Sequence, residues 1–131
     1  MTLAHYPGQS VGALARTLSL THSGAVRLAD RLVAAGLVRR ANPGPGRTLA
    51  LLLTESGQLA AARVLARRRV AVERLVNGLE PEEAAALERL ASRLLTGLTT
   101  DRASAQRLCR LCDEPLCDRW RGCPVDRAAV S

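Results

Sequence analysis

Two short amphipathic stretches follow one another near the start of the chain, separated by a polar break at 19–23. Apolar residues recur in each at the spacing of one helical face, first Val11, Leu14, Ala15 and Leu18 and then Val26, Ala29, Leu32 and Val33. The sequence therefore predicts two helices, over about 10–18 and 22–35. We expect Thr21 to cap the second helix and Gly36 to end it.

A β-hairpin is predicted directly after the second helix. Residues 37–40 are typical of a short strand, and the run Asn42-Pro43-Gly44-Pro45-Gly46 is a dense turn signal. Residues 48–53 alternate in a pattern that places on one face Leu49, Leu51 and Leu53. Two short helices joined by a tight break and followed by a hairpin make a winged helix-turn-helix, whose second helix enters the major groove of DNA.

The second half of the chain is predicted to be helical. Thr54 can cap a long helix from about Glu55 to Val76, and Glu80-Pro81-Glu82-Glu83 begins another helix with Pro in its first turn. The apolar stripe of this last helix comprises Leu87, Leu90, Ala91, Leu94 and Leu98. The two helices leave more apolar surface than we expect one small domain to bury, which predicts a two-fold homodimer.

The predicted fold class is therefore mainly α with a small β-hairpin wing, a winged helix-turn-helix followed by long dimerisation helices. We expect residues 1–54 to be the DNA-binding region, 55–100 the helical dimerisation region and 101–131 a tail that contains all four Cys. Hydrophobic residues make up 47% of the chain but aromatic residues only 2%, so the core must be built from Leu, Val and Ala. Ala and Leu also favour helices.

The charge of the chain predicts a polyanion partner. The formal net charge is +7, and all 19 basic residues are Arg. Residues 1–60 hold six Arg against two acidic residues, a net of +4, so most of the surplus lies in the predicted DNA-binding region. The candidate DNA contacts are Thr21, His22, Ser23, Arg27, Arg31 and Arg47.

The three arginines among these candidates have different expected roles. Arg27, one turn into the second helix, is the best candidate for a bidentate contact to guanine. Arg31 lies further along the helix, and we expect it to meet a phosphate or to pair with Asp30. Arg47 follows the hairpin tip and is placed to reach the minor groove or a backbone phosphate.

These segments resemble the MarR family. The run from Ser10 to Arg40 is similar to the helix-turn-helix of that family, Gly46-Arg47-Thr48 with 51–57 is similar to its wing, and 79–90 is similar to its last helix. The resemblance covers about residues 9–98. It implies a transcriptional regulator that binds double-stranded operator DNA as a homodimer. It also implies a possible small-molecule effector, held between the DNA-binding and dimerisation regions.

Two features depart from the family pattern. Pro45 stands where the family usually has the Asp that supports the wing arginine. The dimer of the family also uses a helix that precedes the helix-turn-helix, whereas this sequence starts almost at that motif. We therefore expect residues 1–9 to be the end of a helix and its loop. Either the start codon is misassigned or the domain is N-terminally truncated, and dimerisation is less firmly implied.

A third feature, the cysteine-containing tail, is not part of the MarR pattern. Four thiols fall within fifteen residues, at Cys109, Cys112, Cys117 and Cys123. In a reducing cytoplasm this density indicates a soft-metal site rather than structural disulfides. Four thiolates suit a closed tetrahedral zinc site or a [4Fe–4S] cluster, and zinc is slightly favoured because it is the commoner structural use. Free surface thiols and a redox-switch disulfide are the alternatives.

Other function classes have little support in the sequence. No apolar run has the length of a membrane span and no signal peptide is recognisable, so we expect a cytoplasmic protein without a membrane partner. No nucleophile–base pair, phosphate loop or carboxylate dyad occurs at a useful spacing, so we do not expect an enzyme. The alternative function is a metal- or cluster-carrying interaction module without sequence-specific DNA binding.

Overall fold

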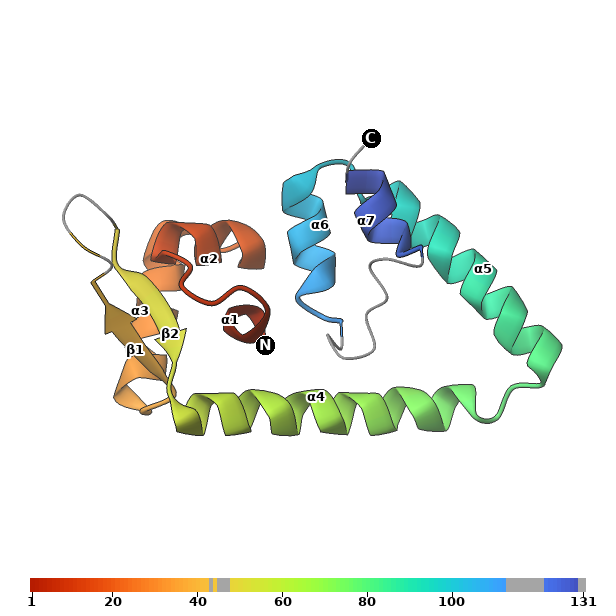
Figure 1. The fold of residues 1–131 in the computed structure, drawn as a ribbon, viewed down its shortest axis with the longest axis horizontal. Coiled ribbons are helices and arrows are strands. Elements are labelled where there is room, and N and C mark those ends of the chain that lie inside the picture. Colours follow the sequence, from red (N-terminus) through yellow and green to blue (C-terminus); the bar gives the residue numbers. More distant parts are fainter. Residues whose placement is uncertain (43, 45–47, 113–121, 130–131) are drawn as a thin grey trace. The chain divides into compact units, whose positions relative to one another are not determined.

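The computed structural model describes residues 1–42, 44, 48–112 and 122–129. Figure 1 shows their elements in chain order: α1 (Thr2–His5), α2 (Val11–Leu18), α3 (His22–Ala34), β1 (Val38–Ala41), β2 (Ala50–Leu53), α4 (Glu55–Val76), α5 (Pro81–Leu98), α6 (Arg102–Cys109) and α7 (Pro124–Ala129). The chain divides into two compact units, Met1–Val64 and Leu65–Ser131, with the boundary inside α4. No helix of the described residues is long and apolar enough to cross a membrane.

The helix-turn-helix consists of α2 and α3, which confirms the two predicted helices. The Ser10 hydroxyl caps α2 by accepting a hydrogen bond from the Ala13 N–H at 3.2 Å. The Thr21 hydroxyl caps α3 as expected, because it accepts from the Gly24 N–H at 3.1 Å. Between the helices, Ser19 has a φ of 54°, and this left-handed conformation turns the chain sharply toward α3.

The predicted hairpin is confirmed, with a shorter second strand. β1 and β2 pair antiparallel, with Val38 opposite Leu53 and Ala41 opposite Ala50. Leu49 lies before β2 and is 51% exposed, so it is not part of the strand face that holds Leu51 and Leu53. On its other side, β2 receives an isolated bridge from Gln9, whose carbonyl accepts from the Leu51 N–H at 2.8 Å.

The core of the first unit lies between its helices and the hairpin. Leu51 is fully buried there, in a cluster that also contains Leu3, Leu14, Ala29 and Val38. Leu3 comes from α1, so the short helix expected within residues 1–9 is present and contributes to the core. α3 presents Ala25 and Ala29 to the core, and the small side chains allow close packing around them.

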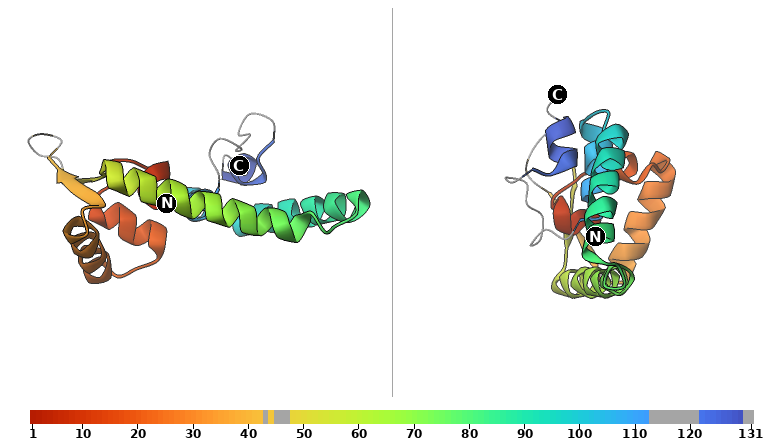
Figure 2. Two further views of the ribbon diagram at one scale, coloured as in Figure 1. Left: turned by 90° about the horizontal axis from the view of Figure 1, so that it is seen from below. Right: turned by 90° about the vertical axis from the view of Figure 1, so that its right-hand side faces the viewer.

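The start of α4 is tied to the end of the helix-turn-helix. The Thr54 hydroxyl accepts from the Gly57 N–H at 3.1 Å and donates to the Gly36 carbonyl at 2.5 Å. Gly57 approaches the chain so closely that a Cβ there would lie 1.9 Å from the Leu37 carbonyl oxygen. The predicted helix over 55–76 and its Thr54 cap are thus confirmed, and Figure 2 shows α4 as one continuous helix.

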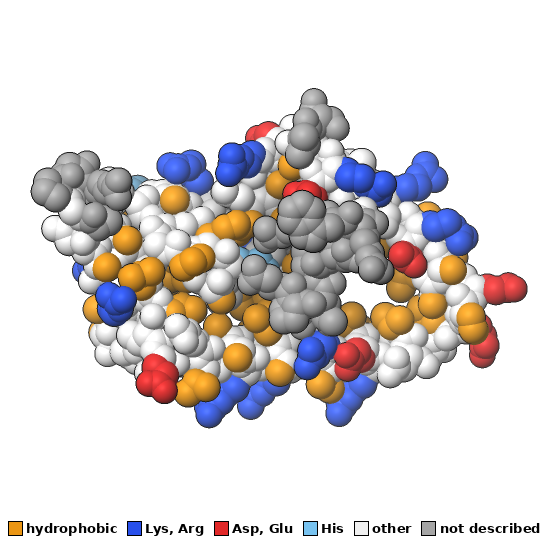
Figure 3. All heavy atoms as spheres, viewed as in Figure 1, with side chains coloured by type: hydrophobic (Ala, Val, Ile, Leu, Met, Phe, Trp, Pro, Cys, Tyr) orange, Lys and Arg blue, Asp and Glu red, His pale blue; other side chains and the backbone are white. Residues whose placement is uncertain are grey.

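The predicted apolar stripe of α5 lies at the surface. The helix begins at Pro81 as expected, and at a capping box, since the Glu83 carboxylate accepts from the Glu80 N–H at 2.9 Å. Its exposed leucines are Leu87, Leu90, Leu94 and Leu98, with exposed fractions from 46% to 68%. Figure 3 likewise shows hydrophobic side chains uncovered on the face that it draws. The stripe is therefore not part of the core of the second unit.

The tail contains two helices that the sequence pattern does not predict. α6 begins at a second capping box, in which the Asp101 carboxylate accepts from the Ser104 N–H at 2.7 Å. The Ser104 hydroxyl in turn accepts from the Asp101 N–H at 3.0 Å. α7 contacts both α5 and α6, and its Val125 is only 3% exposed. Because α7 packs against both helices, the described part of the tail is packed onto α5.

Candidate nucleic-acid interface

Five of the six candidate DNA contacts lie on α3 or at its cap. Thr21, His22 and Ser23 form the start of the helix, and Arg27 and Arg31 follow at intervals of one turn. All five are exposed. Arg47, the candidate from the wing, lies outside the described residues. The structure therefore brings the helical candidates together on one element.

One side chain at the start of α3, that of Thr21, caps the helix. The Thr21 hydroxyl accepts from the Gly24 N–H and lies 3.3 Å from the Ser23 hydroxyl. Because this bond uses an acceptor site of Thr21, the residue serves first as a cap. His22 and Ser23 are exposed beside it.

The arginines of α3 lie away from its buried side. Arg27 and Arg31 are four residues apart and share one side of the helix, whereas Ala25 and Ala29 are fully buried. A guanidinium group has a planar fork of donors that matches guanine edges and phosphate oxygens. The exposed side of α3 therefore presents the chemistry that recognition of a DNA groove requires.

Asp30 pairs with an arginine of the hairpin, not with Arg31. Nη2 of Arg40, on β1, lies 2.5 Å from Oδ1 of Asp30. Of the two roles expected for Arg31, the contact to a phosphate is the one that this pairing favours. Sequence reasoning missed Arg40 because its partner belongs to another element, and the only signal was the basic pair Arg39-Arg40 in a predicted strand.

An apolar cavity of about 300 Å³ lies within the first unit. It is lined by residues of α1, α2, α3, the hairpin and the first part of α4, among them Leu3, Leu14, Leu28, Leu32, Ala61 and Val64. None of the described side chains that line it is charged. A cavity of this size and polarity suits the apolar body of a small ligand.

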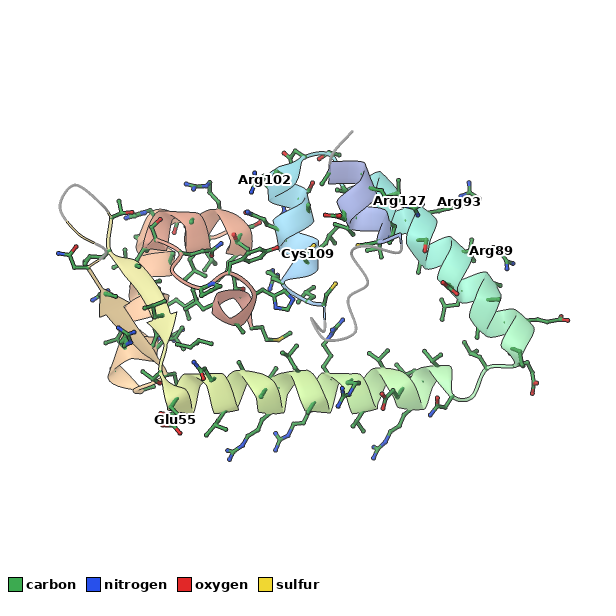
Figure 4. All side chains as sticks on the ribbon, in the orientation of Figure 1. Glu55, Arg89, Arg93, Arg102, Cys109 and Arg127 are labelled. Atoms are coloured by element: carbon green, nitrogen blue, oxygen red, sulfur yellow. The ribbon has the colours of Figure 1, made fainter. Side chains whose placement is uncertain are left out.

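Three of the four candidate metal ligands lie in the described part of the tail. Cys109 ends α6 (Figure 4), and the Cys112 N–H donates to its carbonyl at 2.9 Å. Cys123 directly precedes α7, and Cys117 lies outside the described residues. Within the described residues, no three Cys, His, Asp or Glu side chains are grouped closely enough to hold a metal ion.

The loop between Cys109 and Cys112 is bonded to α4. The Arg68 guanidinium donates a hydrogen bond to the Leu111 carbonyl, which lies inside this loop. The sequence gives no signal for the contact, because Arg68 stands in a run of three arginines. The long helix therefore holds the loop that carries two of the candidate ligands.

Part of the chain matches a protein-family model, and several solved structures are similar to it in fold. Residues 1–48 match a family model described as MarR family. A MarR family protein from Bacillus stearothermophilus is 25% identical, with a TM-score of 0.68 over 74% of this chain and 68% of that one. RV1404 from Mycobacterium tuberculosis is 29% identical, with a TM-score of 0.65 over 72% of this chain and 65% of that one. FabT from Streptococcus pneumoniae, solved in complex with DNA, is 21% identical, with a TM-score of 0.66 over 73% of this chain and 68% of that one.

These similarities establish the fold class. The mainly helical chain with a two-stranded antiparallel hairpin has the winged helix-turn-helix architecture of the MarR structures, as the sequence predicts. The alignments span about two-thirds of each of the three solved proteins. A comparison with curated proteins gives no match.

Proposed function

We propose that the chain is a MarR-family transcriptional regulator that binds double-stranded operator DNA in the cytoplasm through α3 and the wing. The observation that carries the proposal is the exposed side of α3, where Arg27 and Arg31 follow a polar first turn. The net charge of +4 in residues 1–60 favours a polyanion at this unit. FabT, which has the same fold, was solved with DNA. A regulator of this kind is not an enzyme.

DNA affinity of arginine variants tests the proposal. Arg27→Ala is expected to cost on the order of 1–3 kcal/mol and to relax specificity at one base position. Arg47→Ala is expected to weaken all sequences more evenly, because a wing contact to phosphate carries no sequence information. The measurement is fluorescence anisotropy with a duplex that the wild-type protein selects from a random-sequence library.

A matched control separates local contacts from general charge. Arg89, an exposed arginine of α5 (Figure 4), loses the same charge in Arg89→Ala but lies outside the proposed interface. We expect little change in affinity for this variant. If neither Arg27→Ala nor Arg47→Ala differs from the control, α3 is not the recognition helix. The alternative function, a metal-carrying module, then gains support.

We also propose that the regulator works as a two-fold homodimer. The support is the exposed leucine stripe of α5, since buried apolar surface contributes about 25 cal/mol per Å². A two-fold dimer reads an inverted repeat with half-sites about one helical turn apart. Light scattering is expected to give a dimer for the wild type and a monomer for Leu90→Glu with Leu94→Glu. A stable wild-type monomer would contradict this.

The apolar cavity of the first unit is our candidate for the effector site. Its lining has room and polarity for a small aromatic compound, and binding there is expected to change DNA affinity. Indole and benzoate are suitable probes, measured by thermal shift and by release of the selected duplex. Ala61→Leu, which fills part of the cavity, is expected to abolish both responses. Responses that persist in this variant place the effector elsewhere.

The tail is proposed to bind one metal centre through Cys109, Cys112, Cys117 and Cys123. The support is their spacing, together with the contact between α6 and α7, whose ends adjoin Cys109 and Cys123. Zinc is slightly favoured over a [4Fe–4S] cluster. Metal analysis and an absorption spectrum of anaerobically purified protein distinguish the two, because only the cluster absorbs visible light. Each Cys→Ser variant is expected to lose the metal. If all four variants keep their metal content and DNA affinity, the motif is not a site.

A further inference from the structure

The ion pair between Asp30 and Arg40 joins the two elements that the proposed function places against DNA. Asp30 belongs to α3, and Arg40 belongs to β1, the first strand of the wing hairpin. Oδ1 of Asp30 and Nη2 of Arg40 are 2.5 Å apart, so the contact is a charge-assisted hydrogen bond. The two side chains are 53% and 38% exposed, which leaves the pair at the surface of the first unit.

The register of the hairpin explains why Arg40 reaches α3. Arg40 is opposite Leu51 on β2, and Val38 is opposite Leu53. Because residues two apart on a strand share a face, Arg40 lies on the same side of the hairpin as buried Val38. Val38 and Leu51 are in one core cluster with Ala29, the residue before Asp30. Arg40 and Asp30 therefore lie at the edge of this core, at the end of β1 that is nearer the hairpin turn.

The pair can act on DNA binding in two ways that have opposite consequences. If Arg40 touched a phosphate itself, Asp30 would only compete for it and would repel DNA. Removal of the Asp30 charge would then strengthen binding to every sequence. If Asp30 instead fixes Arg40 and with it the hairpin, removal of that charge would weaken operator binding although the protein becomes more positive.

We infer that the Asp30–Arg40 pair is a positioning contact that holds the wing hairpin in a fixed orientation to α3. This inference rests on the proposed DNA-binding function. Two observations favour positioning over a phosphate contact. The Arg40 guanidinium already has a carboxylate partner at 2.5 Å. Arg40 also lies on the same face of β1 as buried Val38. The neighbouring Arg39 lies opposite Leu52 on the other side of β1 and is exposed, so it supplies a control of equal charge.

The experiment compares two duplexes and five variants. The first duplex is selected by the wild-type protein from a random-sequence library, and the second is an unrelated duplex of the same length. The variants are Asp30→Asn, Asp30→Glu, Arg40→Gln, the exchange of Asp30→Arg with Arg40→Asp, and the control Arg39→Gln. Affinity is measured by anisotropy over a series of salt concentrations, which also gives the slope of affinity against salt.

Positioning predicts a specific pattern of losses. Asp30→Asn and Arg40→Gln are each expected to weaken binding to the selected duplex about two- to fivefold, the scale of an exposed ion pair. Binding to the unrelated duplex and the salt slope are expected to change little, because no phosphate contact is lost. Asp30→Glu, which keeps a carboxylate in reach of Arg40, and the exchanged pair are expected to recover affinity for the selected duplex. Arg39→Gln is expected to affect both duplexes alike.

Other patterns overturn the inference. Tighter binding of both duplexes by Asp30→Asn, with a salt slope reduced by about 0.9 in Arg40→Gln, would identify Arg40 as a phosphate contact. An exchanged pair that binds no better than the single variants, together with an Asp30→Glu variant as weak as Asp30→Asn, would also exclude positioning. These results leave DNA binding by the wild type intact. A wild type that selects no duplex overturns the proposed function and this inference together.

Discussion

The two compact units differ in how deeply the leucines of their apolar faces are buried. In Met1–Val64, the leucines of three elements, Leu3, Leu14 and Leu51, are buried in a core that the unit completes by itself. In Leu65–Ser131, the stripe of α5 stays exposed, up to 68% at Leu94. The first unit therefore has a hydrophobic core of its own. The second unit carries an apolar face that gains stability only when another surface covers it.

Leucine truncation gives the largest expected contrast between the units. Leu51→Ala is expected to destabilise the first unit by about 2–5 kcal/mol, because it opens a cavity at a fully buried position. Leu94→Ala removes the same atoms from an exposed position and is expected to leave the unfolding of an isolated chain nearly unchanged. Denaturant unfolding measures both effects.

The same pair of variants also tests dimerisation. In sedimentation equilibrium, Leu94→Ala is expected to raise the dimer dissociation constant, whereas Leu51→Ala is not expected to act through the interface. Equal losses of folding stability in the two variants would remove the contrast between the units.

Glycine substitution gives the next contrast. Gly57→Ala places a Cβ where it would lie 1.9 Å from the Leu37 carbonyl oxygen, so α4 must move, at a cost on the order of 3 kcal/mol. At Gly97 in α5, an added Cβ would point into open space, with no atom within 4 Å beyond the neighbouring residues and backbone of its own helix. Gly97→Ala is therefore expected to be neutral or to stabilise by up to about 1 kcal/mol. Thermal unfolding checks both, and a tolerated Gly57→Ala would show that the α4 junction is loosely packed.

The Arg68 contact sharpens the comparison inside the second unit. Arg68→Ala removes the hydrogen bond to the Leu111 carbonyl, a loss of about 0.5–1.5 kcal/mol. The freed loop is expected to expose its thiols more often. In reduced, metal-free protein, Cys109 and Cys112 should then react faster with a thiol reagent, as followed by mass spectrometry. Arg67→Ala removes the neighbouring exposed arginine and is expected to leave the rate unchanged.

The smallest expected effect is on the start of α6. The pKa of Asp101 lies below its ordinary value. The largest cause is the hydrogen bond that its carboxylate accepts from the Ser104 backbone N–H, and the next is the Ser104 hydroxyl. A lowered folded-state pKa means that the ionised cap stabilises the helix above the unfolded pKa, and that this stability is lost as pH falls through the folded pKa. Far-UV circular dichroism should show a small loss of helix at acid pH. Asp101→Asn, which keeps the acceptor, should remove this contribution to the pH dependence.

Local signals carried most of the fold prediction. Periodic apolar residues, the Thr21 and Thr54 caps and Gly36 placed α2, α3 and α4 close to their observed bounds. The misses have physical causes. Leu49 fits the alternation of a strand, but β2 begins only at Ala50. α6 and α7 are short, and the burial that supports them comes from contacts between separate segments, which periodicity within one segment does not reveal.

The candidate site was predictable as a set of residues but not as a set of partners. A helix-turn-helix pattern identifies which side chains begin α3 and which face away from the core. It does not indicate that Asp30 pairs with Arg40 ten positions further along the chain, or that Arg68 reaches Leu111. Such contacts depend on how elements pack. The DNA contacts and the metal centre remain predictions.

The bridge between Gln9 and Leu51 also has a consequence for self-association at high concentration. With β1 on one side and Gln9 on the other, β2 offers no free backbone edge at Leu51. Among the described strands, the open edge is that of β1, which carries Arg39 and Arg40. Charged residues on an edge strand oppose pairing with the strand of another chain, since the join would bring like charges together without water. The hairpin is thereby protected against the strand-to-strand aggregation that exposed β-edges invite.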